Sequence, residues 1–532
     1  MNKNLHRNIF YIALALFAVL VIWLIFRINI EPTTFDTDEA DHANAGIELF
    51  SAMLTGNIRI IYDAIVRQSF YPPLHSFFIS ISYLILGPTI QSSRFPSIIV
   101  FAAYVLVIAF LTQQFLRKKV LPIYAGSGIA MLLAFTSPIT IKNSVICMLE
   151  PTGLLTTSVS LFAVHKYGGR KDIKAMFLIA FSIILVFLSK YSFGIIVLPA
   201  ILSSLFFEYN PDSGVRLNYK KPFEVCFFTV LLFCIWLFLT DYLSVWHFFV
   251  GHPSYAPILS AENLLYDVRS WLNVYCVNKL ISLFVLGFAV ISVYFFISEP
   301  LIRACLFLVF WALFILGLST TNEERHFLVA APGLWILAGV GYAKLHSLLV
   351  DRKIILNYTQ LFFCGAFLAG IYNHTASLED DIDKGFEGED TYYDLQRFIV
   401  DNISKDSPIL VNGNTDNFSI ESIRWMVASI FRVPYTHVKV DSYPFREDKN
   451  KTARKRKRNL ERPWEVLGFP KKPLINVLET GYYKYAVQIK NLNPKKKQRF
   501  RKEAKEFEEI LAGLQITTKV AVDIKVDIAV VK

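Results

Sequence analysis

The sequence predicts an all-α polytopic membrane domain followed by a small α/β domain. Its 532 residues are 54% hydrophobic and only 18% charged, whereas soluble domains carry about 25% charged residues. The apolar residues gather in runs of roughly 17 to 25, the length that crosses a bilayer as a helix. After residue 376 the composition becomes polar for roughly 150 residues, which is enough for a separate domain. A soluble enzyme, a secreted disulfide scaffold and a disordered chain are therefore excluded.

About eleven apolar runs define the expected crossings. The first, residues 9–28, lacks a small-residue cleavage site and is expected to remain as a signal anchor. The others lie near residues 97–115, 120–136, 152–165, 175–189, 193–207, 222–245, 279–297, 301–318, 327–345 and 355–372. A further run, residues 74–86, spans only about 13 residues, so we expect it to be re-entrant or interfacial.

The placement of Lys and Arg predicts the orientation in the membrane. Cytoplasmic loops collect these residues, and a cytoplasmic N-terminus with eleven crossings puts every short basic loop on that side. The outward segments are then 29–96, 137–151, the turn at Lys190, 246–278, 319–326 and everything after about residue 373. The acidic and histidine-rich segments all face outward, in the inner or plasma membrane of the cell. The net charge of +11 indicates anionic lipid as a partner and does not require nucleic acid.

Two domains are expected, the transmembrane domain over residues 1–375 and an extracytoplasmic α/β domain over residues 376–532. The elements expected in the second domain are a helix near 392–402, a strand at 408–412, a helix at 420–431 and an alternating strand over 520–531. Two basic runs, 449–462 and 495–505, interrupt it. Such runs are ordinarily solvated loops, and contact with anionic headgroups or a phosphate-bearing substrate is the alternative.

The first outward loop, residues 29–96, opens with the strongest candidate chemistry. Four carboxylates and a histidine, His42, fall within eight residues. Capping of a helix that begins near Asp36 would explain one or two of these acids, but not four. Asp38 and Glu39 point in different directions, so one can act as a general base while the other orders the loops. A divalent cation at Asp36, Asp38 and Glu39 stays an open alternative, because hard oxygen ligands suit Mg²⁺, Ca²⁺ or Mn²⁺.

Further candidates follow in the same loop, namely Arg67, Tyr71, His75 and Arg94. Two prolines after Tyr71 favour an extended entry into the short apolar run, which is a structural role. His75 could donate a hydrogen bond to a phosphate, or simply be satisfied at the membrane interface. Arg94 could equally serve as an anchor in the headgroup region.

Three charges lie at the ends of apolar runs, namely Glu150, Lys190 and Arg325, and the last is followed by His326. Ionisable groups close to hydrocarbon depth are costly and often functional. Snorkelling of the side chain towards the interface would explain any one of them. Together they supply a carboxylate and the cations that a phosphate leaving group requires.

These landmarks occur in a recognisable order over roughly residues 1–345. Their local sequences are YPPLH at 71–75, RFPS at 94–97, LEP at 149–151, SKYSFG at 189–194 and RHFLVAAPG at 325–333, after DEADHANAGIEL from Asp38. In this order they resemble the GT-C superfamily of membrane glycosyltransferases. The resemblance is strongest to the branch that contains lipid A aminoarabinose transferases and protein O-mannosyltransferases.

The resemblance implies a role for several of these residues. Asp38 corresponds to the aspartate that is the catalytic base of the superfamily. Glu150 stands where the second acidic motif usually has an aspartate, and Lys190 corresponds to the lysine near the donor phosphate, although Tyr191 replaces the glycine that usually follows. His75 lies in a segment similar to KPPL-H, from which the preceding lysine or glutamate is absent.

The resulting hypothesis is an inverting glycosyltransferase, hexosyl or pentosyl, that moves a sugar from a polyprenyl-phosphate donor to a hydroxyl of a cell-envelope lipid, glycan or protein. Asp38 would be the base, Lys190, Arg325 and His75 would neutralise the departing phosphate, and Glu39 and Glu150 would position loops and substrates. The alternative hypotheses are a transporter or lipid flippase and a non-catalytic envelope assembly protein. A transporter is expected to place charges near the middle of its helices and often to show repeated halves.

Overall fold

The computed structural model describes residues 3–30, 35, 37–67, 71–210, 214–240, 279–317, 324–349, 409–412, 420–432, 440–443, 485–491, 516–521 and 524–530. The chain divides into two compact units. The helical unit comprises Met1–Arg27, Phe70–Leu74 and Ser97–Leu378, and the loop unit comprises Ile28–Ser69, His75–Pro96 and Glu379–Lys532.

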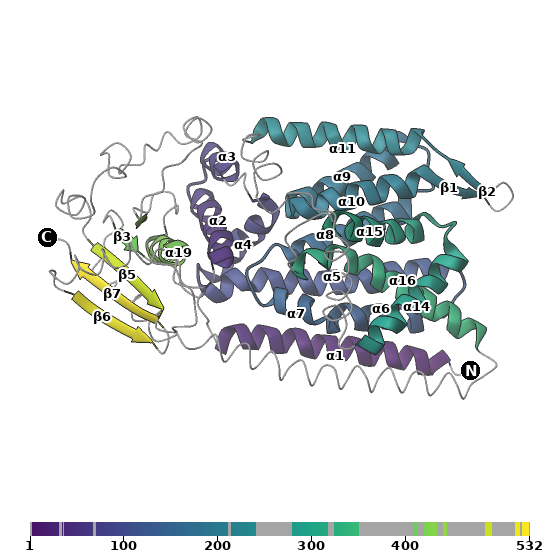
Figure 1. The fold of residues 1–532 in the computed structure, drawn as a ribbon, viewed down its shortest axis with the longest axis horizontal. Coiled ribbons are helices and arrows are strands. Elements are labelled where there is room, and N and C mark those ends of the chain that lie inside the picture. The colour runs from purple at the N-terminus through teal and green to yellow at the C-terminus, as the bar shows by residue number, and fades with distance from the viewer. Residues whose placement is uncertain are drawn as a thin grey trace. The chain divides into compact units, whose positions relative to one another are not determined.

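The helical unit is built from apolar helices that run side by side (Figure 1). They are α1 (Lys3–Ile30), α5 (Ile90–Lys118), α6 (Ile123–Thr136), α7 (Pro138–Ser144), α8 (Glu150–Tyr167), α9 (Ile173–Ser189), α10 (Tyr191–Phe206), α11 (Lys220–Leu239), α14 (Lys279–Phe296), α15 (Pro300–Gly317) and α16 (Ala331–Leu348), with a 3₁₀ helix, η2 (Glu324–Ala330). Each apolar run from 9–28 to 327–345 therefore contains a helix. The last expected run, 355–372, lies outside the described residues.

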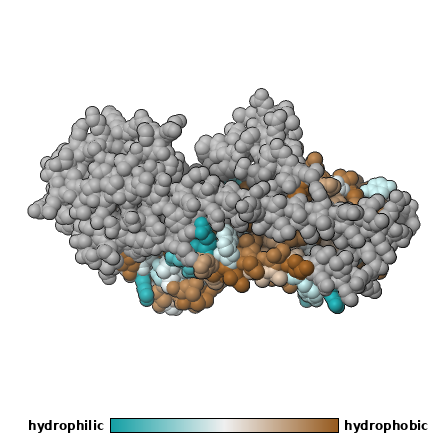
Figure 2. All heavy atoms as spheres, turned by 90° about the horizontal axis from the view of Figure 1, so that it is seen from below, coloured by the Kyte–Doolittle hydropathy of each residue, from teal (hydrophilic) through white to brown (hydrophobic). Residues whose placement is uncertain are grey.

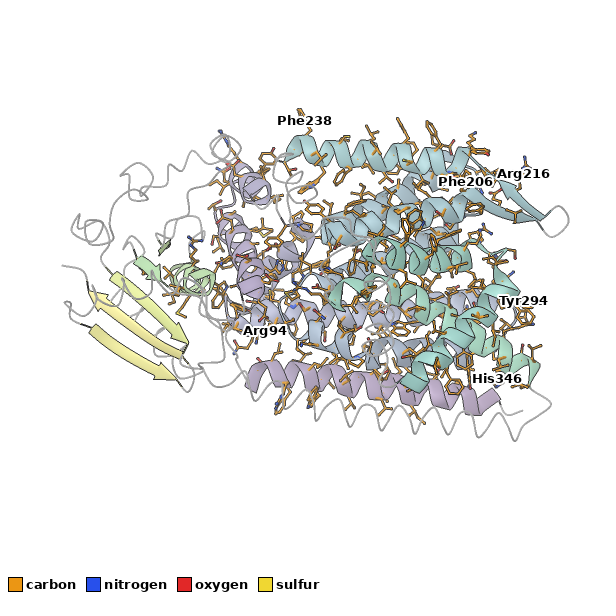
Figure 3. The ribbon with its side chains drawn as sticks, in the orientation of Figure 1. Arg94, Phe206, Arg216, Phe238, Tyr294 and His346 are labelled. Atoms are coloured by element: carbon orange, nitrogen blue, oxygen red, sulfur yellow. The ribbon has the colours of Figure 1, made fainter. Side chains whose placement is uncertain are left out.

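Five helical segments of the described chain are long and apolar enough to cross a membrane. They are Phe10–Asn29, Ile90–Lys118, Lys220–Leu239, Pro300–Gly317 and Arg325–Leu348, and the pair α6 and α7, bent by 59°, adds a sixth if it is one span. The exposed side chains of these helices are themselves apolar, as on α11, where Phe238 is 89% exposed and points away from the bundle (Figure 3). Figure 2 shows hydrophobic side chains gathered along the described part of one face. The chain is therefore an integral membrane protein, and the number eleven stays a prediction.

Glycines bring two helices of this unit into backbone contact. A Cβ added to Gly126 of α6 would lie 2.6 Å from the carbonyl oxygen of Gly339 of α16, and one added to Gly339 would lie 2.5 Å from the carbonyl oxygen of Gly126. In membranes, where lipid tails are as apolar as leucine, such small residues let helices associate by close packing. The two glycines thus determine how closely α6 and α16 approach each other.

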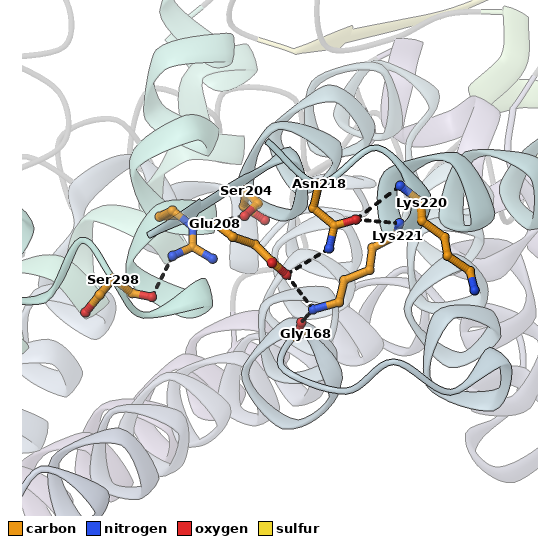
Figure 4. A network of polar contacts seen from close by, with 8 residues as sticks. Gly168, Ser204, Glu208, Asn218, Lys220, Lys221 and Ser298 are labelled. Atoms are coloured by element: carbon orange, nitrogen blue, oxygen red, sulfur yellow. Dashed lines mark hydrogen bonds and ion pairs between the residues drawn. The ribbon is translucent and has the colours of Figure 1, made fainter. Parts of the chain in front are cut away.

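A two-stranded hairpin, β1 (Phe207–Asn210) and β2 (Gly214–Leu217), lies between α10 and α11. It was not expected, because this segment falls in a predicted cytoplasmic loop. Glu208 on β1 accepts hydrogen bonds from Lys221 Nζ (2.7 Å) and Asn218 Nδ2 (3.0 Å), while Lys221 also donates to the carbonyl oxygen of Gly168 (Figure 4). These contacts tie the hairpin to the α8–α9 turn and to the start of α11.

The loop unit contains three helices from residues 29–96, the segment predicted to be the first outward loop. They are α2 (Thr37–Leu54), α3 (Ile58–Arg67) and α4 (Pro73–Leu86). α2 begins one residue after Asp36, where a helix start was expected. α4 has 14 residues, in keeping with a segment too short to span the membrane. α2 and α4 approach closely at Gly46, where an added Cβ would lie 2.3 Å from Cγ2 of Ile79.

A five-stranded mixed sheet completes the described loop unit. Its strands are β3 (Ile409–Asn412), β4 (Val440–Tyr443), β5 (Tyr485–Asn491), β6 (Ile516–Ala521) and β7 (Ile524–Val530), in the order β4-β3-β5-β7-β6. β3 is parallel to β4 and β5, while β7 is antiparallel to β5 and β6. A helix, α19 (Ile420–Phe431), connects β3 to β4 along the chain.

The predicted strand at 408–412 and helix at 420–431 lie where they were expected. Most of the strand predicted over 520–531 is confirmed as β7 (Ile524–Val530), whereas Ala521 ends a separate antiparallel strand, β6, which was not predicted. The predicted helix at 392–402 and the basic runs 449–462 and 495–505 lie outside the described residues. The separate domain over 376–532 stays a prediction.

Candidate active site

The first turn of α2 carries the two carboxylates of the predicted catalytic motif. Asp38 and Glu39 both lie at the positive end of the helix dipole, which stabilises negative charge. Glu39 is buried, at 3% exposure, whereas Asp38 is only half-buried. Successive residues on a helix point in different directions, so the two carboxylates face different surroundings, as the sequence predicted.

Arg94 of α5 binds Glu39 through both arms of its guanidinium group. Nε donates to Oε1 at 3.0 Å and Nη2 donates to Oε2 at 2.9 Å, and both side chains are about 5% exposed or less. The guanidinium carbon lies 5.7 Å from the ring centre of Phe35, a residue just before α2. Arg94 is labelled in Figure 3. Arg94 thus contacts a carboxylate inside the protein, and a loop-ordering role for Glu39 stays a prediction.

The start of α5 is built to hold Arg94 in place. Thr89 and Ser92 form a reciprocal cap, in which Ser92 N donates to Thr89 Oγ1 at 3.1 Å and Thr89 N donates to Ser92 Oγ at 2.8 Å. Pro96 cannot donate to the Ser92 carbonyl oxygen four residues earlier. Ser82 Oγ of α4 donates to this carbonyl instead, at 2.7 Å. The proline is therefore accommodated without an orphaned carbonyl group.

Two histidines of the predicted site come together in the loop unit. The rings of His42 and His75 lie edge to face with their centres 6.2 Å apart, and both are buried. His75 is thus enclosed by protein, and its predicted contact with a phosphate stays a prediction. Tyr71 is half-buried before α4, and Arg67 is the last residue of α3, with a side chain outside the described part.

The helical unit brings together Glu150, Lys190 and Arg325. Lys190 Nζ lies 2.5 Å from Glu150 Oε1, and Arg325 Nε lies 3.9 Å from the same oxygen. Glu150 is 1% exposed, and Arg325 is half-buried beside His326 in η2. These charges, distant in sequence, were predicted to act together, and the structure places three of them in one cluster.

Local backbone geometry explains how Lys190 reaches Glu150. Lys190 is the single extended residue, with φ −158° and ψ 114°, between α9 and α10. Its Nζ lies 5.1 Å from the ring centre of Phe193, and that ring packs so closely on α8 that a Cβ on Gly153 would lie 2.7 Å from it. Phe193 and Gly153 were not among the predicted site residues, although each lies three residues after a predicted one, Phe193 after Lys190 and Gly153 after Glu150.

The cluster carries two cations against one carboxylate. A buried carboxylate is costly unless it is paired, and here Lys190 and Arg325 both pair with it. Two cations beside one buried carboxylate are an arrangement that suits a phosphate group, the usual partner of such charge-assisted donors. Glu150 also begins α8, followed by Pro151 at a position where proline fits a helix start.

The metal alternative receives no support from the residues that the structure describes. Within them, no three His, Cys, Asp or Glu side chains gather in a way that could hold an ion. Asp36, one of the three candidate ligands, lies outside the described residues. Both carboxylate oxygens of Glu39 are already bound by Arg94.

One family model matches the sequence over residues 71–238, and its description is dolichyl-phosphate-mannose-protein mannosyltransferase. The matched stretch contains His75, Arg94, Glu150 and Lys190. The matched stretch does not include Asp38 and Glu39 of α2, or Arg325. No curated protein matches the sequence.

Two solved structures share the fold over almost the whole chain. The crystal structure of ArnT from Cupriavidus metallidurans bound to undecaprenyl phosphate matches with a TM-score of 0.62 and 12% identity, covering 97% of each chain. The apo structure of the same protein matches with a TM-score of 0.57 and 13% identity, again over 97% of each chain. The chain therefore has the fold of ArnT, and its resemblance to the GT-C superfamily of membrane glycosyltransferases is confirmed.

Proposed function

We propose that the chain is an integral-membrane glycosyltransferase that uses a polyprenyl-phosphate sugar as its donor. The observation that carries this proposal is the cluster in which Lys190 and Arg325 both approach the buried carboxylate of Glu150. Its fold is that of a protein whose crystal structure holds undecaprenyl phosphate, and residues 71–238 match a mannosyltransferase model. The acceptor is a hydroxyl group of an envelope lipid, glycan or protein, and the sugar is a hexose or a pentose.

Asp38 is the proposed general base. It takes the proton of the acceptor hydroxyl while that oxygen forms a bond to the anomeric carbon of the sugar. The bond between the anomeric carbon and the phosphate oxygen breaks on the opposite face, and the phosphate leaves with the electron pair, so that the configuration inverts. Glu39, whose two oxygens Arg94 binds, is assigned the ordering of the loop, and Asp38 the chemistry.

Lys190 and Arg325 are the proposed partners of the donor phosphate. Negative charge grows on the phosphate as it leaves, and fixed cations lower the free energy of that transition state. Glu150 keeps Lys190 in place through a contact of 2.5 Å. His75, His326, Tyr71 and Arg67 are proposed as further substrate contacts, on the strength of their motifs.

The test is transfer of label from a mixed pool of polyprenyl-phosphate sugars into membrane lipids and proteins. Asp38→Asn is expected to lower the rate by about 10² to 10⁴, the usual contribution of a general base. Asp63→Asn, on the exposed face of α3, is the matched control and should keep the wild-type rate. Transfer that survives Asp38→Asn would remove the assignment of the base. Failure to transfer from any donor would contradict the proposed function as a whole.

A further inference from the structure

α19, the helix that follows β3, packs against α2, the helix that carries Asp38 and Glu39. Its largest buried side chain is Trp425, which is 1% exposed. A buried indole N–H needs an acceptor, and here Trp425 Nε1 donates to Tyr83 Oη of α4 at 3.0 Å. The two residues are 342 positions apart in sequence. A residue from the far end of the chain thus contacts the first outward loop.

The hydrogen bond from Trp425 continues towards Arg94. Tyr83 Oη lies 2.6 Å from Ser93 Oγ, and Ser93 Oγ donates to the carbonyl oxygen of Thr89 at 2.8 Å. With the Ser93 hydroxyl proton donated to Thr89, Ser93 Oγ can accept a hydrogen bond from Tyr83, whose hydroxyl also lies 3.5 Å from the carbonyl oxygen of Ala43. The chain of donors therefore runs from Trp425 through Tyr83 and Ser93 to the first turn of α5. Ser93 immediately precedes Arg94.

A second path from Trp425 reaches the other side of the same ion pair. The Trp425 ring meets the Phe35 ring edge to face, with centres 4.8 Å apart and planes at 88°. Phe35 in turn lies under the Arg94 guanidinium group at 5.7 Å and comes just before α2. Trp425 thus supports Arg94 through its N–H and Phe35 through its ring.

We propose that Trp425 is a positioning residue, which holds the Glu39–Arg94 pair and so fixes the first turn of α2 that carries Asp38. This proposal rests on the glycosyltransferase function proposed above. Catalysis loses rate steeply when a reacting group moves by about 1 Å, and buried hydrogen-bond networks rigidify the groups that they satisfy. The α19 segment is accordingly part of what orients the base, although it carries no reacting group.

Three variants separate the hydrogen-bonded path through Tyr83 from the ring contact with Phe35. Trp425→Phe keeps an aromatic ring against Phe35 and loses the N–H donor, whereas Trp425→Ala loses both contacts. Tyr83→Phe keeps its ring and breaks the chain of hydrogen bonds. Trp311→Phe is the matched control, because Trp311 Nε1 donates to a hydroxyl, Ser203 Oγ, at the same 3.0 Å but within the helical unit.

We expect kcat to fall about tenfold in Trp425→Phe and further in Trp425→Ala, with KM for the donor unchanged. Trp425→Phe combined with Tyr83→Phe should be no slower than Tyr83→Phe alone, because both changes break one chain of hydrogen bonds. Trp311→Phe should stay within about twofold of wild type. Equal kcat values for wild type, Trp425→Phe and Trp425→Ala, each per folded molecule, would overturn the proposal.

A readout that needs no transfer keeps this proposal distinct from the proposed function. Hydrogen exchange of the α2 amides, residues 37–54, should speed up in Trp425→Ala while exchange in α8 and α9 stays at the wild-type rate. If the wild-type protein transfers no sugar, the proposed function fails and the exchange experiment still tests the support of α2 by Trp425. Unchanged α2 exchange, or a uniform rise through the molecule, would show that Trp425 is an ordinary core residue and would overturn the proposal.

Discussion

At the scale of single residues, the candidate site is organised by buried ion pairs. Glu39 with Arg94 and Glu150 with Lys190 are each almost fully removed from solvent. Removing two charges from water costs about as much as their attraction returns, so such pairs are weak evidence for stability. Their presence at the positions of the predicted motifs is better explained by a need to hold particular side chains in fixed orientations.

Breaking the pair of Glu150 and Lys190 should therefore lower the free energy of unfolding. Lys190→Met leaves Glu150 buried with Arg325 at 3.9 Å as its remaining ion-pair contact in the cluster, and we expect a loss of about 3–5 kcal/mol in the free energy of unfolding. Adding Glu150→Gln removes the buried carboxylate, whose remaining contact with Arg325 is long, and should restore a large part of this loss. Chemical unfolding in detergent measures both effects.

Lys174→Met is the control for this experiment. Lys174 lies on α9, the helix that ends next to Lys190, and its side chain is exposed. A surface charge of this kind contributes within about 1 kcal/mol. If Lys190→Met were as stable as Lys174→Met, the contact between Lys190 and Glu150 would not be an energetically coupled buried pair.

The charged residues of the candidate site could be predicted from the sequence, whereas the aromatic residues that pack around them could not. Asp38, Glu150 and Lys190 stand out because carboxylates and amines beside apolar runs are rare and chemically distinct. Phe35 and Trp425 do not stand out in a chain with 46 Phe and 8 Trp. Their roles depend on contacts between residues far apart in sequence, which no local pattern encodes.

At the scale of elements, the candidate charges lie where helices begin or end. Asp38, Glu39 and Glu150 occupy helix N-termini, where the dipole favours carboxylates. Lys190 is at once the C-cap of α9, where its backbone N–H donates to the Val186 carbonyl oxygen, and the residue before α10. A helix terminus offers both a fixed backbone and a favourable field, so it can orient a charge that a helix interior would bury at a cost.

Two glycines of α6 predict opposite effects of the same substitution. A Cβ at Gly126 would lie 2.6 Å from a backbone oxygen of α16, whereas at Gly128 the nearest atom is 3.9 Å away. Gly126→Ala should force α6 and α16 apart and destabilise the protein by about 1–3 kcal/mol. Gly128→Ala should be neutral or stabilising by up to about 1 kcal/mol, because alanine favours the helix. Unfolding midpoints of the two variants provide the comparison, and equal midpoints would contradict the close contact.

The polar contacts of the β1–β2 hairpin predict an acid-sensitive element. Burial raises the pKa of Glu208, but hydrogen bonds from Lys221 and Asn218 outweigh it and hold that pKa below its ordinary value. Likewise, burial raises the pKa of Glu299, and contacts with Lys119 and Lys118 bring it below the ordinary value. A carboxyl group whose pKa is lower in the folded state stabilises the fold at pH values above its ordinary pKa, about 4.3. It loses this contribution as the pH falls from there through its lower pKa in the folded state.

Stability should therefore decline in wild type as the pH is lowered from about 5 towards 3, in part through these two groups. Lys221→Met removes the strongest contact of Glu208, at 2.7 Å, and should make the decline shallower. Lys220→Met is the neighbouring control, since the Lys220 side chain is 81% exposed and lies 3.9 Å from Glu224. Unfolding midpoints against pH measure the slopes, and identical slopes for wild type and Lys221→Met would exclude the proposed coupling.

At the scale of the whole molecule, the apolar runs predicted the helices well and the assembly of the units poorly. Each described run holds a helix, because a membrane-sized apolar segment has few other solutions. The grouping of Ile28–Ser69 and His75–Pro96 with Glu379–Lys532 was not foreseen, nor was the hairpin at β1 and β2. Strand pairing and packing between distant segments depend on three-dimensional contacts that periodicity does not report.

The predicted orientation can be tested directly. In a background with the six cysteines replaced, Asn57→Cys in the first outward loop should react with a membrane-impermeant maleimide added outside intact cells. Lys171→Cys, in the basic turn before α9, should react only after the cells are opened. Both residues are exposed in the structure, so accessibility to the reagent depends on the side of the membrane. The opposite labelling pattern would invert the topology, and equal labelling of both would contradict a fixed orientation.

The one-residue link at Lys190 also constrains how the chain enters its membrane. A single extended residue joins α9 to α10, so if both helices cross the bilayer, as predicted, their insertion is coupled and Lys190 lies at the link between them. Synthesis proceeds from the N-terminus, so Glu150 of α8 has already left the ribosome when Lys190 emerges. The carboxylate that pairs with the lysine is therefore made first, and the order of the two residues along the chain becomes part of how the protein is made.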